Sequence, residues 1–133
     1  MFGQFDISAS ALTAQRTRLD TISSNIANIH STMGPNGEPS PYRRLFATFV
    51  AERTENGGAG VRVKSIAQDP SDFKLKFEPN HPAADASGWV KYPNVDLSTE
   101  YVNALETTRA YEANITAIET TKSMMNATLR LLA

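Results

Sequence analysis

The sequence predicts an α+β fold in which long N- and C-terminal helices form a coiled-coil-like hairpin, with a small antiparallel β unit between them. Near both ends of the 133-residue chain, large apolar residues recur at alternating three- and four-residue spacing, as they do on a helix face that meets a partner helix. Between these ends, short segments alternate apolar and charged residues, as half-buried strands do. We therefore expect an N-terminal helix within residues 1–31, a linker and β-rich middle domain over residues 32–95, and a C-terminal helix within residues 96–133.

The first helix is expected over residues 5–30, a length of about 40 Å at the helical rise of 1.5 Å per residue. Its seam repeats in heptads, which favours a left-handed superhelix with a partner. Polar side chains occupy two seam positions where a self-sufficient coiled coil would carry leucine or isoleucine. The seam residues are Phe5, Ser8, Leu12, Gln15, Leu19, Ile22, Ile26 and Ile29.

The second helix is expected to follow an N-cap at Asp96 or Ser98 and to run to Leu132, a length of about 50 Å. Its seam is interrupted by polar residues, and the helix contains many threonines, which are mediocre helix formers. We expect both arms to be largely frayed in the free monomer and to become continuous helices when neighbouring copies cover their remaining faces. The seam residues are Tyr101, Ala104, Thr108, Tyr111, Ile115, Ile118, Lys122, Met125, Leu129 and Leu132.

Three strands are expected in the middle domain, at residues 45–51, 61–66 and 73–77, separated by turns rich in glycine and proline. In the third strand, the aromatic and leucine side chains would point to a buried face and the two lysines to solvent. We expect these strands to form one unit at the far end of the helical hairpin. The aromatic cluster at residues 89–93 either closes the core of this unit, which is the commoner arrangement, or forms an interface hot spot.

Charge and composition narrow the class of protein. The 13 basic and 14 acidic residues nearly balance, so a broad electrostatic footprint for nucleic acid is not expected. The chain has no cysteine, which removes disulfides, thiolate zinc sites and thiol nucleophiles. No apolar run approaches the roughly 20 residues needed to cross a bilayer. The first residues lack a basic cluster followed by an apolar core, so we expect no cleaved secretory signal and, for any role outside the cytosol, another export route.

No arrangement typical of an active site or a metal site is present. The two histidines, His30 and His81, stand apart beside turn residues, and the aspartates of the middle domain lack the spacing of an EF-hand. Ser24 and Asp85 have no positioned base or oxyanion device. We therefore expect no cofactor, no metal and no enzymatic activity.

Two short motifs resemble the signatures of a known family. The run SNIAN at residues 24–28 resembles the S-x-N-[LI]-A-N signature of bacterial flagellar axial proteins, and RAYEAN at residues 109–114 resembles their R-x-Y-x-A-N signature. The middle segments GVRV, DPS, PNHP, ADASG and YPNV resemble the proximal rod proteins of the flagellar basal body. The resemblance covers almost the whole chain. One departure is the linker MGPNGEPSP between Thr32 and Tyr42, and no conformation is predicted for residues 31–44.

The resemblance implies a structural subunit of the proximal rod that assembles helically around the central export channel and transmits torque. It also implies a location in the flagellar basal body, in a rod spanning the periplasm. The implied partners are other copies of the chain, neighbouring rod proteins and, during secretion, the flagellar type III export apparatus. No nucleic acid and no membrane insertion are implied.

The assembly interface is expected on both helices. Asn25 and Asn28 would satisfy polar groups of an adjacent subunit; alternatively, they only terminate the first helix, where asparagine is common. The full set of expected interface residues is Leu12, Leu19, Ile22, Ser24, Asn25, Ile26, Ala27, Asn28, Leu105, Arg109, Tyr111, Asn114, Ile115, Ile118, Met125 and Leu129.

Two other classes of function are weighed against a rod subunit. A soluble coiled-coil adaptor that binds one defined partner would form a discrete folded oligomer, whereas a rod subunit would have mobile ends until it assembles. A secreted enzyme that cleaves cell-wall polymers would need paired carboxylates, and the sequence shows no such pair in a cleft-forming pattern.

Overall fold

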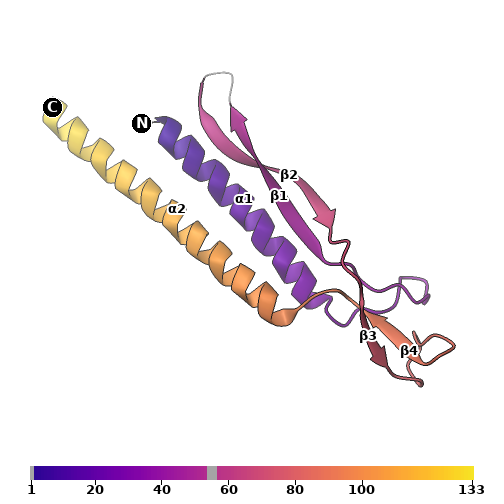
Figure 1. The fold of residues 1–133 in the computed structure, drawn as a ribbon. Helices are drawn as coiled ribbons and strands as arrows, with labels where there is room; N and C mark the ends of the chain where they lie inside the picture. The colour runs from indigo at the N-terminus through magenta and orange to yellow at the C-terminus, as the bar shows by residue number, and fades with distance from the viewer. Residues whose placement is uncertain (1, 54–56) are drawn as a thin grey trace.

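The computed structural model describes residues 2–53 and 57–133 and has the α+β architecture predicted from the sequence. Two long helices at the ends of the chain flank two β-hairpins (Figure 1). The elements in chain order are α1 (Phe2–Ala27), β1 (Leu45–Arg53), β2 (Ala59–Gln68), β3 (Lys74–Phe77), β4 (Trp89–Tyr92) and α2 (Leu97–Leu132).

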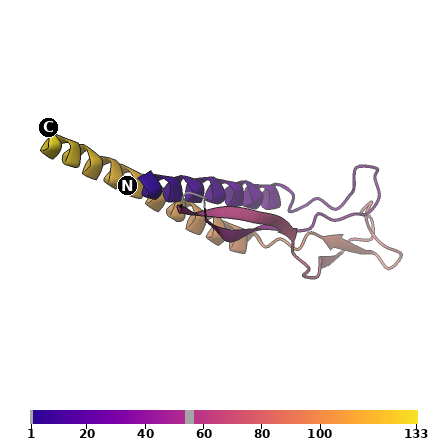
Figure 2. The ribbon, with the colours of Figure 1, turned by 90° about the horizontal axis from the view of Figure 1, so that it is seen from above.

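The two helices lie side by side and antiparallel, which confirms the predicted hairpin. Both termini lie at one end of the molecule, and α2 continues past the first turn of α1 in both views (Figures 1 and 2). Helix α1 has 26 residues and α2 has 36, so the difference corresponds to about 15 Å of helix. Neither helix is apolar enough over its described residues to span a membrane.

The helix boundaries follow local chemistry. Helix α1 ends at Ala27, three residues earlier than the predicted end at residue 30, because residues 28–30 form a turn in which the Ser31 amide donates to the Asn28 carbonyl oxygen at 3.0 Å. Helix α2 starts after Asp96, whose carboxylate accepts from the Thr99 amide at 3.1 Å. Of the two N-cap candidates that the sequence offered, Asp96 and Ser98, the structure uses Asp96, whose side-chain oxygen satisfies an otherwise unpaired backbone donor.

The middle of the chain forms two separate two-stranded sheets, so the expectation of a single unit at the far end of the helices is wrong. Strands β1 and β2 pair antiparallel, with a bulge between Thr48 and Phe49, and lie along α1 (Figures 1 and 2). The Val61 amide donates to the Ser10 hydroxyl of α1 at 3.0 Å. Residue 60 must be glycine for this approach, since a Cβ there would lie 2.9 Å from the Ser10 oxygen.

The second hairpin, β3–β4, lies beyond the helix pair, next to the start of α2 (Figure 1). The prediction that the third strand buries its apolar side chains is wrong: Leu75 and Phe77 are 61% and 57% exposed. The register pairs the lysines of β3 with Val90 and Tyr92 of β4, and Val90 is fully buried. The two lysines therefore share the face of β3–β4 that carries Val90, but they remain exposed at 55% and 66%. The amine of Lys74 reaches the Val95 carbonyl oxygen at 2.8 Å.

The sequence did not predict β4, whose residues were interpreted only as an aromatic cluster. The cluster was expected either to close the core or to form an interface hot spot, and its residues differ in this respect. Pro93 is fully buried, as expected of a core residue. Trp89 is half exposed and meets Phe77 edge to face at 5.3 Å, whereas the Tyr92 hydroxyl donates to Glu78 at 2.6 Å.

Candidate functional site

The most densely bonded part of the molecule lies where the end of α1, the start of β1 and the start of α2 meet. We call this the buried junction and define it by Asn25, Tyr42, Arg44 and Glu100, with Asp69 and Asn94 at its edge. Asn25 and Glu100 have no exposed surface. Burying polar groups costs free energy unless each one is paired, so the contacts of each residue decide whether this junction stabilises the fold.

Every hydrogen-bonding position of the Asn25 amide is used within the chain. Its nitrogen donates to the Leu45 carbonyl oxygen at 2.8 Å and to the carboxylate of Glu100 at 3.3 Å. Its oxygen accepts from the Leu45 amide at 2.9 Å and from the Tyr42 hydroxyl at 3.0 Å. Since an amide side chain has two donors and an acceptor with two lone pairs, this one is saturated and ties α1 to both β1 and α2.

Arg44 is the ion-pair partner of Glu100. The Nε of Arg44 donates to Oε1 of Glu100 at 2.5 Å, and one of its terminal nitrogens lies 3.3 Å from Asp69. Burial opposes the charge of Arg44, but the hydrogen bond and charge of Glu100, followed by those of Asp69, raise the pKa of Arg44 above its ordinary value. Glu100 also stands in the first turn of α2, where the helix dipole favours a negative charge.

At the edge of the junction, hydrogen bonds hold together the loop segments that precede and follow the strands. The Arg44 amide donates to the side-chain oxygen of Asn94 at 2.8 Å, and the Asn94 nitrogen donates to the Asp69 carbonyl oxygen at 3.1 Å. Hydrogen bonds from the hydroxyl and amide of Ser71, together with the Arg44 guanidinium, lower the pKa of Asp69. Arg43 donates to the carbonyl oxygens of Asp69 and Ser71 and stacks on the ring of Phe73 at 4.2 Å.

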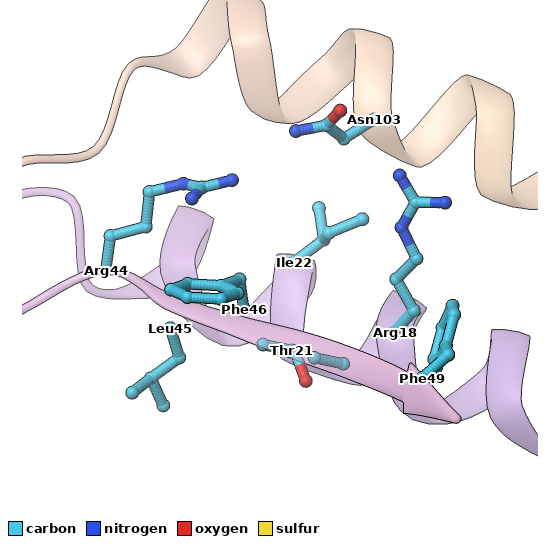
Figure 3. Close-up of a pocket in the computed structure, with 9 residues that line it drawn as sticks. Arg18, Thr21, Ile22, Arg44, Leu45, Phe46, Phe49 and Asn103 are labelled. Carbon is cyan, nitrogen blue, oxygen red and sulfur yellow. The ribbon is translucent and has the colours of Figure 1, made fainter. Parts of the chain in front are cut away.

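A hollow of about 350 Å³ opens beside the junction, between β1 and α2 (Figure 3). Phe46 and Phe49 of β1 lie on one side of it and Asn103 of α2 on the other. Arg18 of α1 reaches across and forms an ion pair with Glu106 at 3.7 Å. Within residues 2–53 and 57–133, no group of three histidine, cysteine or carboxylate side chains could hold a metal ion.

The structure distributes the sequence-predicted interface residues over three environments. Two are buried within the chain, Ile22 and Asn25. Eight are half-buried: Leu12, Ser24, Ile26, Asn28, Tyr111, Asn114, Ile118 and Met125. Six are exposed: Leu19, Ala27, Leu105, Arg109, Ile115 and Leu129.

The two asparagines of the SNIAN motif differ in their contacts. Asn25 bonds inside one chain, where both its donors and its acceptor are used. Asn28 donates to the Ser24 carbonyl oxygen at 2.8 Å and accepts from the Ser31 hydroxyl at 3.0 Å. These contacts close the last turn of α1, as the helix-terminating alternative expected.

The face that α2 turns towards the protein interior is more polar than its predicted seam. Its two buried side chains are Glu100 and Thr107. Tyr101, Leu105 and Ile115, which the sequence placed at the interface or on the seam, are exposed. Most of the large apolar side chains of α2 are therefore left uncovered in the single chain, whereas Tyr111, Ile118 and Met125 are half-buried.

Sequence reasoning did not identify Tyr42, Arg44, Asn94 or Glu100 as members of a bonded group. Asn25 and Glu100 are 75 residues apart in the chain, so no local spacing reveals that they pair. The available signal was weak: Arg44 stands directly before a predicted strand, and Glu100 lies in the first turn of a helix whose neighbouring positions are small or apolar.

Comparison with known proteins places both helices in families of flagellar proteins. Residues 5–35 match a family described as "Flagella basal body rod protein", and residues 86–131 match one described as "Flagellar basal body rod FlgEFG protein C-terminal". The first matched segment contains Asn25 and the second contains Glu100. The buried junction therefore joins the two matched segments to each other.

Several curated proteins are similar to this chain over nearly their whole length. The flagellar basal-body rod protein FlgC of Yersinia enterocolitica is 44% identical, over 96% of this chain and 94% of the relative. The protein of the same name in Bacillus subtilis is 41% identical over 98% of this chain and 97% of the relative. The protein of the same name in Salmonella typhimurium is 44% identical over 96% of this chain and 94% of the relative.

Proposed function

The chain belongs to the family of flagellar basal-body rod proteins, and from this premise we propose that it builds the proximal part of the rod. Members of this family are structural and not enzymatic, so the chain is a structural subunit of the basal body. In the proposed arrangement, copies of the chain assemble helically around the export channel and transmit torque along the rod. Other rod proteins of the basal body are the neighbours of such a subunit.

The observation that carries this proposal is the distribution of polar and apolar side chains on the helix pair. The buried junction satisfies its polar groups inside one chain, and so sets the orientation of α2 relative to α1. That orientation leaves Tyr101, Leu105 and Ile115 exposed on α2. Because burying a large apolar side chain contributes about 1.5–3 kcal/mol, such a surface favours association with further helices.

We extend the proposal to the three parts of the chain. Residues 1–31 and 96–133 would form the inner layer around the channel, and residues 32–95 would pack outside it. The chain would leave the cytoplasm through the flagellar type III export apparatus and take its place in a rod that spans the periplasm. Helices that are completed only by neighbouring subunits suit this route, because a stable free coiled coil would resist passage through a narrow channel.

The test is incorporation into basal bodies. In the bacterium that encodes this chain, deletion of its gene should abolish motility and rod assembly, and an epitope-labelled copy should restore both and co-purify with the rod. Basal bodies with a complete rod in the deletion strain would contradict the proposal.

Hydrogen exchange on the purified chain distinguishes a rod subunit from a soluble adaptor. A rod subunit should be monomeric when dilute, with amides near the end of α2 that exchange at close to the rate of an unfolded chain. Strong protection throughout residues 100–130 in a discrete oligomer would favour an adaptor that binds one defined partner.

A further inference from the structure

A groove of about 500 Å³ lies between α1 and α2 near the end of the molecule that carries both termini. Ile7 and Ser8 line it from α1, and Ala113, Ala117 and Thr120 line it from α2. All of these side chains except Ile7 are small, and Ile7 itself is 43% exposed. Small side chains leave a depression between two helices that can accept larger side chains of a third helix.

The last part of α2 has no cover in the single chain. We call residues 122–132 the overhang, since α2 extends beyond the first turn of α1 there (Figures 1 and 2). All its side chains are exposed except Met125, which is half-buried. Leu131 is 87% exposed and Leu132 is 80% exposed. A helical segment without packed neighbours is marginal in water, so the overhang is a segment in need of a partner.

The charges of the groove and of the overhang are opposite. The overhang carries only Lys122 and Arg130, whereas the charged residues that stand among or directly before the groove-lining residues are acidic; the basic residues Arg16 and Arg109 lie further along the helices, and Lys122 follows the last lining residue, Thr121. The acidic residues are Asp6, Glu112 and Glu119.

These charges are also positioned to meet a partner. Glu112 and Glu119 stand about one turn before and after Thr116, which lines the groove, so they share its side of the helix. Within the described residues 2–53 and 57–133, none of the five charged side chains forms an ion pair.

We infer that the overhang of one copy docks in the α1–α2 groove of a second copy, with Lys122 and Arg130 facing the acidic residues that flank the groove. The inference rests on the proposed function and specifies which surfaces of two subunits meet. On α2 the groove is centred near residue 117 and the overhang near residue 127, so the second copy is displaced by about 15 Å along the helix axis. Because the two surfaces differ, the contact repeats without closing and produces a helical series of subunits.

Cysteine cross-linking tests the contact directly, because the chain has no cysteine of its own. Cells that lack the natural gene would express Ala117→Cys and Ala127→Cys chains together, and isolated basal bodies would be treated with a short thiol cross-linker. We expect a cross-linked dimer from the mixture and little dimer from either variant alone. Val102→Cys mixed with Ala127→Cys is the matched control, since Val102 is exposed on the same helix but far from the groove, and it should give no dimer.

Each outcome of this experiment has a defined meaning. Rods that contain both variants but give no 117–127 cross-link would overturn the docking inference and leave the proposed function standing. Dimers of one variant alone would indicate a symmetric contact and would also overturn the docking inference. A cross-link to a different rod protein would overturn it as well, and in both cases the proposed function would stand. Absence of the unmodified chain from isolated basal bodies would instead overturn the proposed function.

Charge reversal gives a second test that does not depend on a cross-linker. The double substitution Lys122→Glu and Arg130→Glu should lower incorporation into basal bodies about threefold or more, since exposed charge pairs contribute modestly but additively. Adding Glu112→Lys and Glu119→Lys to the same chain should restore incorporation. All four side chains are exposed, so the substitutions leave the fold of the single chain intact. Normal incorporation of the first variant, or no recovery in the second, would overturn the inference.

Discussion

The two ends of the helix pair differ in how their side chains are satisfied. At the end where α2 begins, the buried junction places a carboxylate and an amide out of contact with water, and pairs every polar atom of Asn25 inside the chain. At the end where α2 finishes, leucine side chains are almost fully exposed and charged side chains lack partners among the described residues. The first end is complete in one molecule, and the second is not.

This difference indicates how a subunit can have one defined arrangement of its helices although part of it is completed only by a neighbour. The junction uses hydrogen bonds and an ion pair, whose geometry requires one arrangement of α1, β1 and α2. The overhang uses apolar surface, which is less demanding in direction and gains free energy whenever a neighbour covers it. Changes at the junction should therefore act on the folding of the single chain, and changes at the overhang on assembly.

Arg44→Ala should have the largest effect, because it leaves the carboxylate of Glu100 buried without its cation. We expect the free energy of unfolding to fall by about 3–5 kcal/mol, as for other broken buried ion pairs. Urea unfolding followed by circular dichroism measures it. Arg62→Ala is the control: its ion pair with Glu52 is exposed on both sides, at 57% and 53%, and should contribute about 0–1 kcal/mol. Equal effects of the two substitutions would contradict the distinction between the junction and the surface.

Asn25→Ala should have the next largest effect, since it removes four hydrogen bonds, takes this partner from both backbone groups of Leu45 and leaves the Tyr42 hydroxyl with Ser24 alone. We expect a loss of about 2–3 kcal/mol. Asn28→Ala, three residues away in the same motif, removes bonds within the last turn only and should cost at most about 1 kcal/mol. Unfolding measurements on both variants test whether the two asparagines have different bonding roles or the motif acts only as a helix end; similar losses would favour the latter.

Acid should weaken the junction through Asp69. The hydrogen bonds of Ser71, followed by Arg44, hold the pKa of Asp69 below its ordinary value in the folded chain. The unfolded chain therefore binds a proton first as the pH falls, so the stability contributed by this carboxylate is present above about pH 4 and is lost below it. The urea midpoint should fall between pH 7 and pH 3, and it should fall less in Asp69→Asn. Asp72→Asn, which alters an exposed carboxylate nearby, should follow the unmodified chain.

The contrast between the two ends also explains what the sequence could predict. Helix spacing identified both helices, and Asp96 was found because a cap acts on a residue three positions away. Strands β2 and β3 were found from local alternation and β1 from a short apolar run of ambiguous phase, but β4, between Gly88 and Pro93, was interpreted only as an aromatic cluster. These signals are all local.

The junction could not be predicted from such signals, because Asn25, Arg44 and Glu100 come from three separate elements. Their pairing is visible only once the helices are placed side by side. The polar inner face of α2 has the same origin: periodicity marked Tyr101 and Ile115 as seam residues, but the pairing of Glu100 with Arg44 rotates these side chains to the outside. Apolar spacing identifies a face that will be covered, not the molecule that covers it.

Changes at the overhang should have the smallest effect on the single chain and still reduce assembly. Leu131→Ser with Leu132→Ser alters two side chains that are 87% and 80% exposed, so the free energy of unfolding should change by no more than about 0.5 kcal/mol. Incorporation into basal bodies should nevertheless fall, since the surface that a neighbour would cover becomes polar. Asn126→Ser changes the same segment without removing apolar surface and is the matched control. If the double variant lost stability and incorporation in parallel, the overhang would belong to the fold of one chain, and the two ends would not differ as described.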